Sequence, residues 1–262
     1  YYSVKKNMTA CKPNTPIMTS YGFASSIDHA NNVGDDIFQI FLRSPHSYKA
    51  GRKGKKDLLY IKKKSKEYNI KVLIHGNFML NFCNPPGTFI HNRSTQILAE
   101  DLDDCVTAGG MGVVIHMGHN VKKLKISENE AKKNFIKGIE KSLEKSKDES
   151  ILILETGAGQ GNEIYTELSE LGELRNSIDK KYVNRVKFCI DTCHIFASGY
   201  DLSTPLYIDM LDLHIENTLQ WKNVIVVHLN DSKEPLNCRK DRHADIGKGC
   251  IGLDGLIEFV KY

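Results

Sequence analysis

The sequence predicts an α/β fold, a (β/α)8 TIM barrel whose last strand is absent from the chain as it stands. Short apolar runs alternate with helical patterns along the chain, and no linker or low-complexity segment interrupts them. Strands joined by crossover helices pair in parallel. The length of 262 residues suits such a barrel, which commonly needs about 250 residues. We therefore expect residues 1–262 to form one domain, with residues 1–16 as an N-terminal extension.

Seven strands are expected from runs rich in Val, Ile and Leu. In order they are Ile17 to Tyr21, Ile37 to Phe41, Val72 to His75, Val113 to His116, Ile151 to Glu155, Val186 to Asp191 and Val224 to His228. Helical patterns between them cover Leu58 to Tyr68, Ser94 to Ala108, Glu128 to Lys145, Tyr165 to Ser177 and Leu206 to Leu219. The last of these helices follows a Ser-Thr-Pro sequence, which is typical of a helix start.

A final helical pattern, LDGLIEFVKY, ends at Tyr262, and no eighth apolar run follows it. An open barrel would expose the edges of its first and seventh strands to pairing with other chains. We therefore expect the natural protein to continue beyond Tyr262. Because the sequence opens on Tyr1 rather than Met, an upstream piece is also expected.

Composition favours a protein of the cell interior. No run approaches the roughly 18 apolar residues of a membrane span, and the first residues lack the apolar region of a secretory signal. Seven cysteines without a repeated CxxC pair favour reduced thiols over a disulfide framework. We expect a location in the cytoplasm or nucleus, or in a virus particle or factory, with no secretion and no membrane partner.

Basic residues are concentrated between Lys49 and Lys66, where nine Lys or Arg accompany one acid, although the net charge is only +4. This segment is either a solvated loop and helix face or a surface that binds the phosphates of a polyanion. Its run Lys62, Lys63 and Lys64 is the candidate for nucleic-acid contact. Charge alone does not choose between the two interpretations.

Five of the predicted strands end in side chains that bind metal ions. These are His75, His116, Glu155, Asp191 and His228. The carboxyl ends of barrel strands meet on one rim, where such enzymes build their active sites. Imidazole and carboxylate are zinc ligands, and a carboxylate that bridges two ions offsets their repulsion. A lone histidine would more often be structural, but five endings in register predict a centre with several metal ions.

A second group of ligand-type residues follows the strands. His194 lies three residues after Asp191, so the turn leaving that strand can bring both to the rim. Asp241 and His243 are two apart, on one side of an extended segment. Cys189 also precedes Asp191 by two residues, but the FCID run should bury its thiol in the barrel wall.

The motifs around these residues resemble the signatures of the endonuclease IV family of apurinic/apyrimidinic (AP) endonucleases. They are LETGAGQG from Leu154, CIDTCHIFASGYDLSTP from Cys189, HLNDSK from His228 and DRHADIGKGCIG from Asp241. The resemblance extends from about Ile17 to the end of the chain. It implies a zinc-dependent hydrolase of DNA base excision repair. Such an enzyme cuts the phosphodiester 5′ to an abasic site and leaves a 3′-hydroxyl and a 5′-deoxyribose phosphate.

The resemblance also implies three zinc ions, with Mn²⁺ as an alternative in mixed nitrogen and oxygen sites. By position, the first ion takes His75, His116 and Glu155, the second takes Glu155, Asp191 and His228, and the third takes His194, Asp241 and His243. Glu155 would thus bridge two ions and act in catalysis by orienting the attacking hydroxide. The family has a further ligand, a glutamate at the end of the last strand, which has no counterpart in this sequence.

Residues implied to contact DNA are Gln160, which would enter the helix at the lesion, Phe78, which would act as a wedge, and Arg242. Two departures from the family pattern, SYGFAS near the first strand and His46 in place of an arginine, weaken the expected phosphate contacts there. The implied partner is double-stranded DNA with an abasic site, and a monomer is expected.

Two other functions remain to be weighed. Metal-dependent sugar isomerases and epimerases have a similar barrel but need only one or two divalent ions, so a third ligand cluster counts against them. A catalytically silent DNA-binding relative would be expected to have lost ligands. All the family ligands that fall within the sequence are present.

Overall fold

A computed structural model describes residues 25–49 and 51–261 of the chain, and the predicted strand Ile17 to Tyr21 and the N-terminal extension fall outside these residues. Six parallel strands form one sheet in the order of the sequence, each paired with the next. They are β1 Ile37–Phe41, β2 Lys71–His75, β3 Val113–Ile115, β4 Leu152–Glu155, β5 Val186–Asp191 and β6 Val224–His228. This parallel order confirms the predicted class, and each strand agrees with its predicted range to within one residue at either end.

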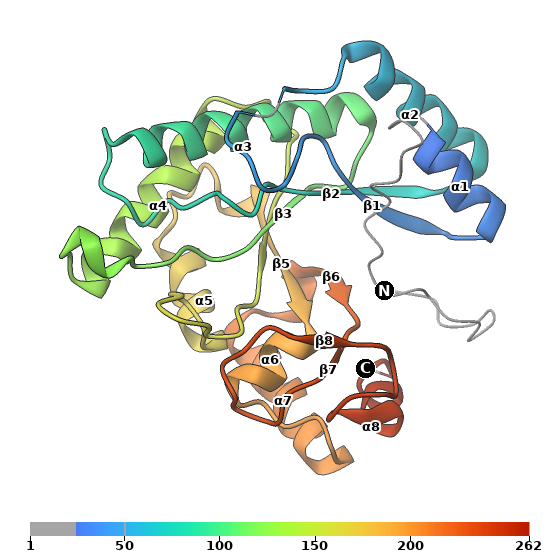
Figure 1. Cartoon of the computed structure of the whole chain (residues 1–262), viewed down its shortest axis with the longest axis vertical. Helices are drawn as coiled ribbons and strands as arrows, with labels where there is room; N and C mark the ends of the chain where they lie inside the picture. The colour runs from blue at the N-terminus through green and yellow to red at the C-terminus, as the bar shows by residue number, and fades with distance from the viewer. Residues whose placement is uncertain (1–24, 50, 262) are drawn as a thin grey trace.

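Helices follow the strands and surround them in an arc (Figure 1). They are α1 Ser25–Val33, α2 Lys55–Tyr68, α3 Phe89–Ala108, α4 Glu128–Glu144, α5 Leu168–Ser177, α6 Thr192–Ser198, α7 Pro205–Thr218 and α8 Gly252–Phe259. Short 3-10 helices lie at η1 Lys122–Leu124, η2 Val183–Arg185 and η3 Trp221–Asn223. The five helices expected between strands are confirmed, and α8 overlaps the final helical pattern, beginning one residue before it; α1 and α6 were not expected.

Local signals explain where the helices begin and end. Thr88 caps α3 by accepting a hydrogen bond from the His91 backbone N–H, and Thr204 caps α7 in the same way, with Pro205 in the first turn. Gly109 ends α3 with a φ of 74°, in the left-handed region that glycine adopts without strain. These capping residues fix where α3 and α7 begin and where α3 turns toward the next strand, β3.

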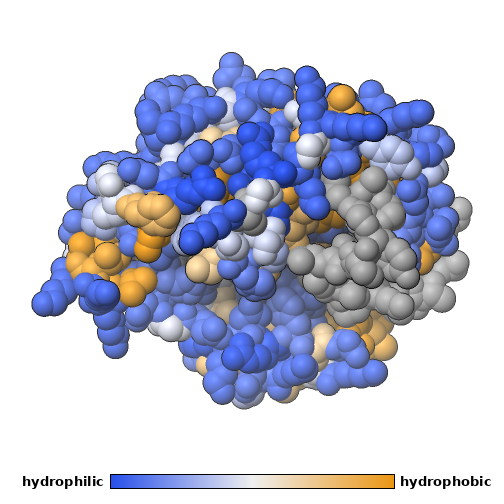
Figure 2. Space-filling view, turned by 45° about the horizontal axis from the view of Figure 1, so that its top comes forward, coloured by the Kyte–Doolittle hydropathy of each residue, from blue (hydrophilic) through white to orange (hydrophobic). Residues whose placement is uncertain are grey.

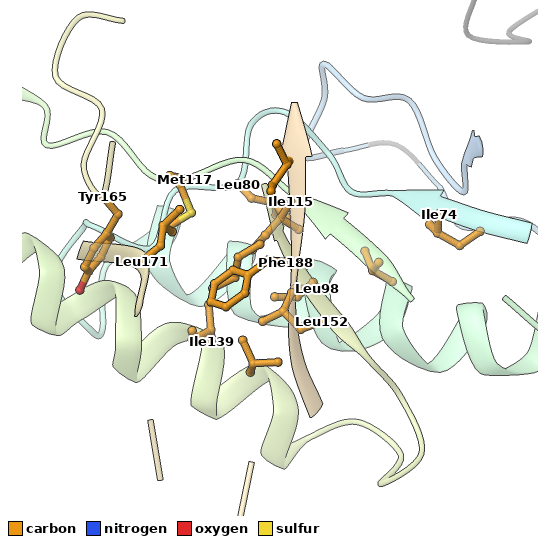
Figure 3. Packing of buried hydrophobic residues seen from close by; sticks show 14 of the residues in the cluster. Ile74, Leu80, Leu98, Ile115, Met117, Ile139, Leu152, Tyr165, Leu171 and Phe188 are labelled. Carbon is orange, nitrogen blue, oxygen red and sulfur yellow. The ribbon is translucent and has the colours of Figure 1, made fainter. Parts of the chain in front are cut away.

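The main core lies between the sheet and the helices. Figure 3 shows Phe188 of β5 among side chains from β3, β4, α3 and α4, including Ile115, Leu152, Leu98 and Ile139. All five are almost fully buried. Burial of each such side chain contributes roughly 1.5–3 kcal/mol, so this core fixes the strands on which any functional side chains are mounted.

The exposed surface is different in character. On the face drawn in Figure 2 most residues are hydrophilic, and apolar residues occupy separate areas. Among the described residues, no helix combines the length and the apolar composition that a membrane crossing requires.

After β6 the chain forms a short antiparallel hairpin, β7 Asp231–Ser232 and β8 His243–Ala244, which lies against α6.

Candidate metal centre

Strand alternation brings the five predicted ligands together. One residue from each of β2 to β6 lies in a small inner core, and these residues are Leu73, Val114, Ile153, Cys189 and Val226. The residue two positions later on each chain segment points to the same side, because side chains alternate along a strand. Those later residues are His75, His116, Glu155, Asp191 and His228. The inner core therefore forms a floor, with the ligand-type side chains directly above it on the rim.

Glu155 lies between His75 and His116, which face one of its carboxylate oxygens, and His228, which faces the other. Its Oε2 lies 3.4 Å from His75 Nε2 and 3.2 Å from His116 Nε2, and its Oε1 lies 2.7 Å from His228 Nδ1. The side chain is 2 % exposed. Burial alone would raise the pKa of Glu155, but the neighbouring His228 and His116 hold that pKa well below its usual range. Glu155 is therefore an ionised carboxylate surrounded by imidazoles.

Asp191 explains the spacing of the DTCH motif. Its Oδ1 accepts a hydrogen bond from the His194 backbone N–H at 3.1 Å, so Asp191 ends β5 and also caps α6. Its Oδ2 accepts from Asn230 Nδ2 at 2.6 Å and lies 3.7 Å from His243 Nε2. Asp191 therefore ends β5 and caps α6, and His194, in the first turn of α6, is brought to the rim beside it.

The β7–β8 hairpin brings in Asp241 and His243. Asp241 Oδ2 lies 3.2 Å from His194 Nε2, and its Oδ1 lies 3.0 Å from His243 Nε2. Although burial opposes it, the neighbouring imidazoles of His194 and His243 place the pKa of Asp241 far below its usual range. The three side chains therefore form a compact cluster beside Asp191.

Two imidazoles are oriented by backbone carbonyls. Nδ1 of His75 lies 2.9 Å from the Gly76 carbonyl oxygen, and Nδ1 of His194 lies 2.8 Å from that of Thr156. A ring N–H that donates to a carbonyl leaves the lone pair on Nε2, the nitrogen that faces the carboxylates in both residues. Metal-binding histidines are commonly held in this way.

Several buried polar atoms of this cluster have no hydrogen-bond partner within the described part of the protein, as expected of atoms that bind a metal ion. Among the buried side-chain atoms of the described residues, Glu155 Oε2, His194 Nε2 and His243 Nε2 have no hydrogen-bond partner. Buried polar atoms rarely stay unpaired without a ligand. Ligand atoms of His75, His116 and Glu155 lie within 4.8 Å of one another, as do those of Glu155, Asp191 and His194 and those of His194, Asp241 and His243. The residues present can therefore hold more than one cation.

Two cysteines also come near the centre. Cys189 lies within ligand distance of Glu155 and His228, and Cys193 within that of Asp191 and His243. Both thiols are buried, and burial raises the pKa of each to about 11. The predicted burial of Cys189 in the barrel wall is confirmed, since it belongs to the inner core. A neutral thiol there serves packing.

Known proteins are similar to this chain over nearly its whole length. A family profile described as xylose isomerase-like TIM barrel matches residues 27–261. A putative endonuclease 4 of Acanthamoeba polyphaga mimivirus is 34% identical over 248 residues, which are 94% of this chain and 80% of that protein. The chain belongs to the endonuclease IV family.

Two further relatives agree with this family membership. Apurinic-apyrimidinic endonuclease 1 of Saccharomyces cerevisiae is 31% identical over 89% of this chain and 63% of its own length. The crystal structure of endonuclease IV from Thermus thermophilus superposes with a TM-score of 0.78 at 27% identity, covering 93% of this chain and 84% of that one. The resemblance carried by the four motifs and the TIM-barrel prediction are both confirmed.

In this family member, three of the predicted DNA contacts lie at the metal centre. Phe78 is 42% exposed, and its ring packs 5.0 Å from that of His75 and 5.3 Å from that of His116. Gln160 Oε1 accepts hydrogen bonds from the backbone N–H of Asp241 at 3.1 Å and from Arg242 Nη1 at 3.5 Å. The Gly-rich loop that presents Gln160 needs Gly159, whose φ is 75° and whose Cβ would lie 2.8 Å from Arg239.

The structure does not bring Lys62, Lys63 and Lys64 to this rim. They lie in the C-terminal half of α2, and Lys62 packs on Gly109, where a Cβ would be 3.2 Å from Lys62 Cγ. Gly109 ends α3 just before β3 begins, at the amino ends of the strands. These lysines therefore lie at the opposite end of the barrel from the ligands.

Three residues of the centre were missed by sequence reasoning. Gln39 Oε1 lies 2.9 Å from His228 Nε2, Asn230 holds Asp191, and Asp231 organises the loop that follows β8. A polar residue inside the apolar run IFQIF was the available signal for Gln39. Asn230 and Asp231 belong to HLNDSK, which was used only as a family signature.

Proposed function

We propose that this protein is a zinc-dependent AP endonuclease that cuts the DNA backbone 5′ to an abasic site, leaving a 3′-hydroxyl and a 5′-deoxyribose phosphate. The observation that carries the proposal is the convergence of the eight ligand-type residues on one rim around Glu155. Family membership makes the protein an enzyme of the hydrolase class, and the relatives' names include apurinic-apyrimidinic endonuclease. The metal identity and the number of ions belong to the proposal.

In this proposal three sets of residues hold the ions. His75, His116 and Glu155 hold one, Glu155, Asp191 and His228 hold another, and His194, Asp241 and His243 hold the third. Bound zinc would supply Lewis-acid chemistry, which activates water near neutral pH and stabilises charge on a leaving oxygen. Mn²⁺ is the alternative ion.

The chain's own side chains position and charge this centre. Glu155 supplies the carboxylate shared by two sets, Asn230 and the His194 backbone N–H fix Asp191, and the Thr156 carbonyl orients His194. Phe78 and Gln160 flank the ligands from two different loops. A nucleotide lacking its base would leave a gap in the duplex, and in this proposal these two side chains fill it.

A sugar isomerase or epimerase is the alternative for a barrel of this type. Such an enzyme has no use for the cluster of His194, Asp241 and His243, in which Asp241 lies 3.2 Å from His194 Nε2 and 3.0 Å from His243 Nε2. A silent DNA-binding relative has no reason to retain buried ligand atoms without hydrogen-bond partners. Both alternatives leave part of the centre unexplained.

The position of the cut tests the proposal. Zinc-loaded protein is given a duplex with one abasic analogue and a label on the damaged strand, and the products are mapped at single-nucleotide resolution. We expect one cut on the 5′ side of the lesion and a product end that a DNA polymerase extends, because it is a 3′-hydroxyl. An intact strand, or a cut on the 3′ side alone, would refute the activity.

The setting of the protein is also part of the proposal. An enzyme of this kind would work where DNA is, in the cytoplasm or nucleus or in a virus particle or factory, and as a monomer. These features stay predictions.

A further inference from the structure

A second group of lysines lies on the same rim as the metal centre and takes no part in it. Lys122, Lys123 and Lys125 fall in the loop between β3 and α4, six to nine residues after His116. We propose that this loop binds backbone phosphates of the DNA on one flank of the lesion. The inference rests on the proposed function, because it takes duplex DNA as the substrate of the rim.

The loop is held firmly in place. On one side the Asn120 backbone N–H donates to the Asn162 carbonyl at 2.8 Å, and that of Ile164 donates to the Gly118 carbonyl at 3.0 Å. On the other side Asn81 Nδ2 donates to the His119 carbonyl at 3.0 Å. The first two bonds tie the lysine loop to the Gly-rich loop that carries Gln160, and the third ties it to the loop that follows β2. A loop already ordered loses less conformational entropy when it binds a ligand.

The lysines are free to meet an anion. All three are exposed, and none of them forms an ion pair with an acid in the part of the chain that the structure describes. Lys125 adopts a φ of 52°, which closes the 3-10 turn η1 and keeps the three side chains on one short turn. Three cations within four residues resemble the sites that gain from counterion release on DNA.

A polar hollow lies beside the loop. It measures about 460 Å³ and is lined by Lys122, Asn120 and Asn162, together with the acids Glu128 and Glu163. Glu128 pairs with Lys132 at 2.7 Å, and Glu163, which keeps its negative charge, accepts from the Gly159 backbone N–H at 2.8 Å. Lys122 is the one cation that lines this polar hollow in the described part of the chain, next to the loop that carries Gln160.

The basic segment singled out in the sequence does not compete for this role. Arg52 pairs with Asp104 at 2.6 Å, and Lys62, Lys63 and Lys64 lie at the far end of the barrel. The lysine loop and the α2 lysines thus offer two triplets of equal charge on opposite ends of one molecule. This gives a matched comparison.

The test is the salt dependence of DNA binding by the zinc-loaded chain. K122Q/K123Q/K125Q and K62Q/K63Q/K64Q are compared with the wild type on an undamaged duplex, across about 50 to 200 mM salt. We expect the loop variant to lower the slope of log affinity against log salt by about 0.9 for each phosphate that the loop no longer neutralises. The α2 variant should leave the slope within error of the wild type, and circular dichroism checks that both fold.

Two results would overturn the proposal: an unchanged slope in the loop variant, or an equal reduction in both variants, which would mean a response to net charge alone. A failure of the proposed function would show in the cutting assay and not in the salt dependence of binding. Wild-type protein that binds duplexes through the loop but never cuts an abasic strand would refute the endonuclease activity and leave the surface standing. Normal cutting with an unchanged slope would refute the surface alone.

Discussion

Glu155→Gln is expected to lower the rate of cutting at an abasic site by at least about a thousandfold, which corresponds to ~4 kcal/mol of lost transition-state stabilisation. The substitution keeps the shape of a side chain that is 2 % exposed, so packing changes little. It removes the one carboxylate that faces His75, His116 and His228 together. An amide neither offsets the repulsion between two cations nor bridges them well. Bound metal should fall with activity.

The measurement is the single-turnover cutting rate, with metal content determined by elemental analysis of the same samples. Glu149→Gln is the control, because Glu149 is exposed in the turn before β4, at the opposite end of the barrel. We expect that variant to behave as the wild type. A Glu155→Gln protein with full metal content and a rate within tenfold of the wild type would contradict the central position given to this residue.

Asp231→Asn is expected to destabilise the fold by about 3 kcal/mol, because several buried donors lose their acceptor at once. Asp231 is 0% exposed. Its two carboxylate oxygens accept hydrogen bonds from the backbone N–H groups of Ser232, Gly247, Gly249, Ile251 and Gly252. An amide would turn an NH2 group toward some of these donors. The hairpin that presents His243 should loosen as a result.

Chemical denaturation measures this effect, and zinc content reports on the hairpin. Asp245→Asn is the matched control, since Asp245 is an exposed acid of the same loop that pairs with Lys248 at 3.5 Å. Exposed pairs of this kind contribute about 0–1 kcal/mol. If the two variants lost equal stability, Asp231 would not be the anchor of the loop.

The strands and the first ligands could be predicted because one physical pattern sets both. Parallel barrel strands are buried on both faces, so they appear as short apolar runs, and the residue that ends each run reaches the rim. His75, Glu155 and Asp191 were found in this way, and the structure brings them together. Spacing also singled out His194 and Asp241 as ligand-type residues, but only the likeness to a family assigned them to a third ion.

Other features depend on the three-dimensional arrangement. The helix α6 is only seven residues long and follows directly on Asp191, which caps it, so periodicity could not reveal it. The role of Asp231 depends on donors up to 21 residues away in the sequence. The charge of the α2 lysines was visible, but not the end of the barrel at which they lie. Because α2 returns antiparallel to the strands, its second half points away from the rim.

Metal dependence of the cutting reaction tests the central claim most directly. Zinc is removed from the wild type by a chelator, added back in measured equivalents, and the rate of cutting 5′ to the abasic analogue is recorded at each step. The arrangement around Glu155 predicts no cutting without metal and full recovery only as about three equivalents bind, one for each ligand set. Undiminished cutting by metal-free protein would contradict it.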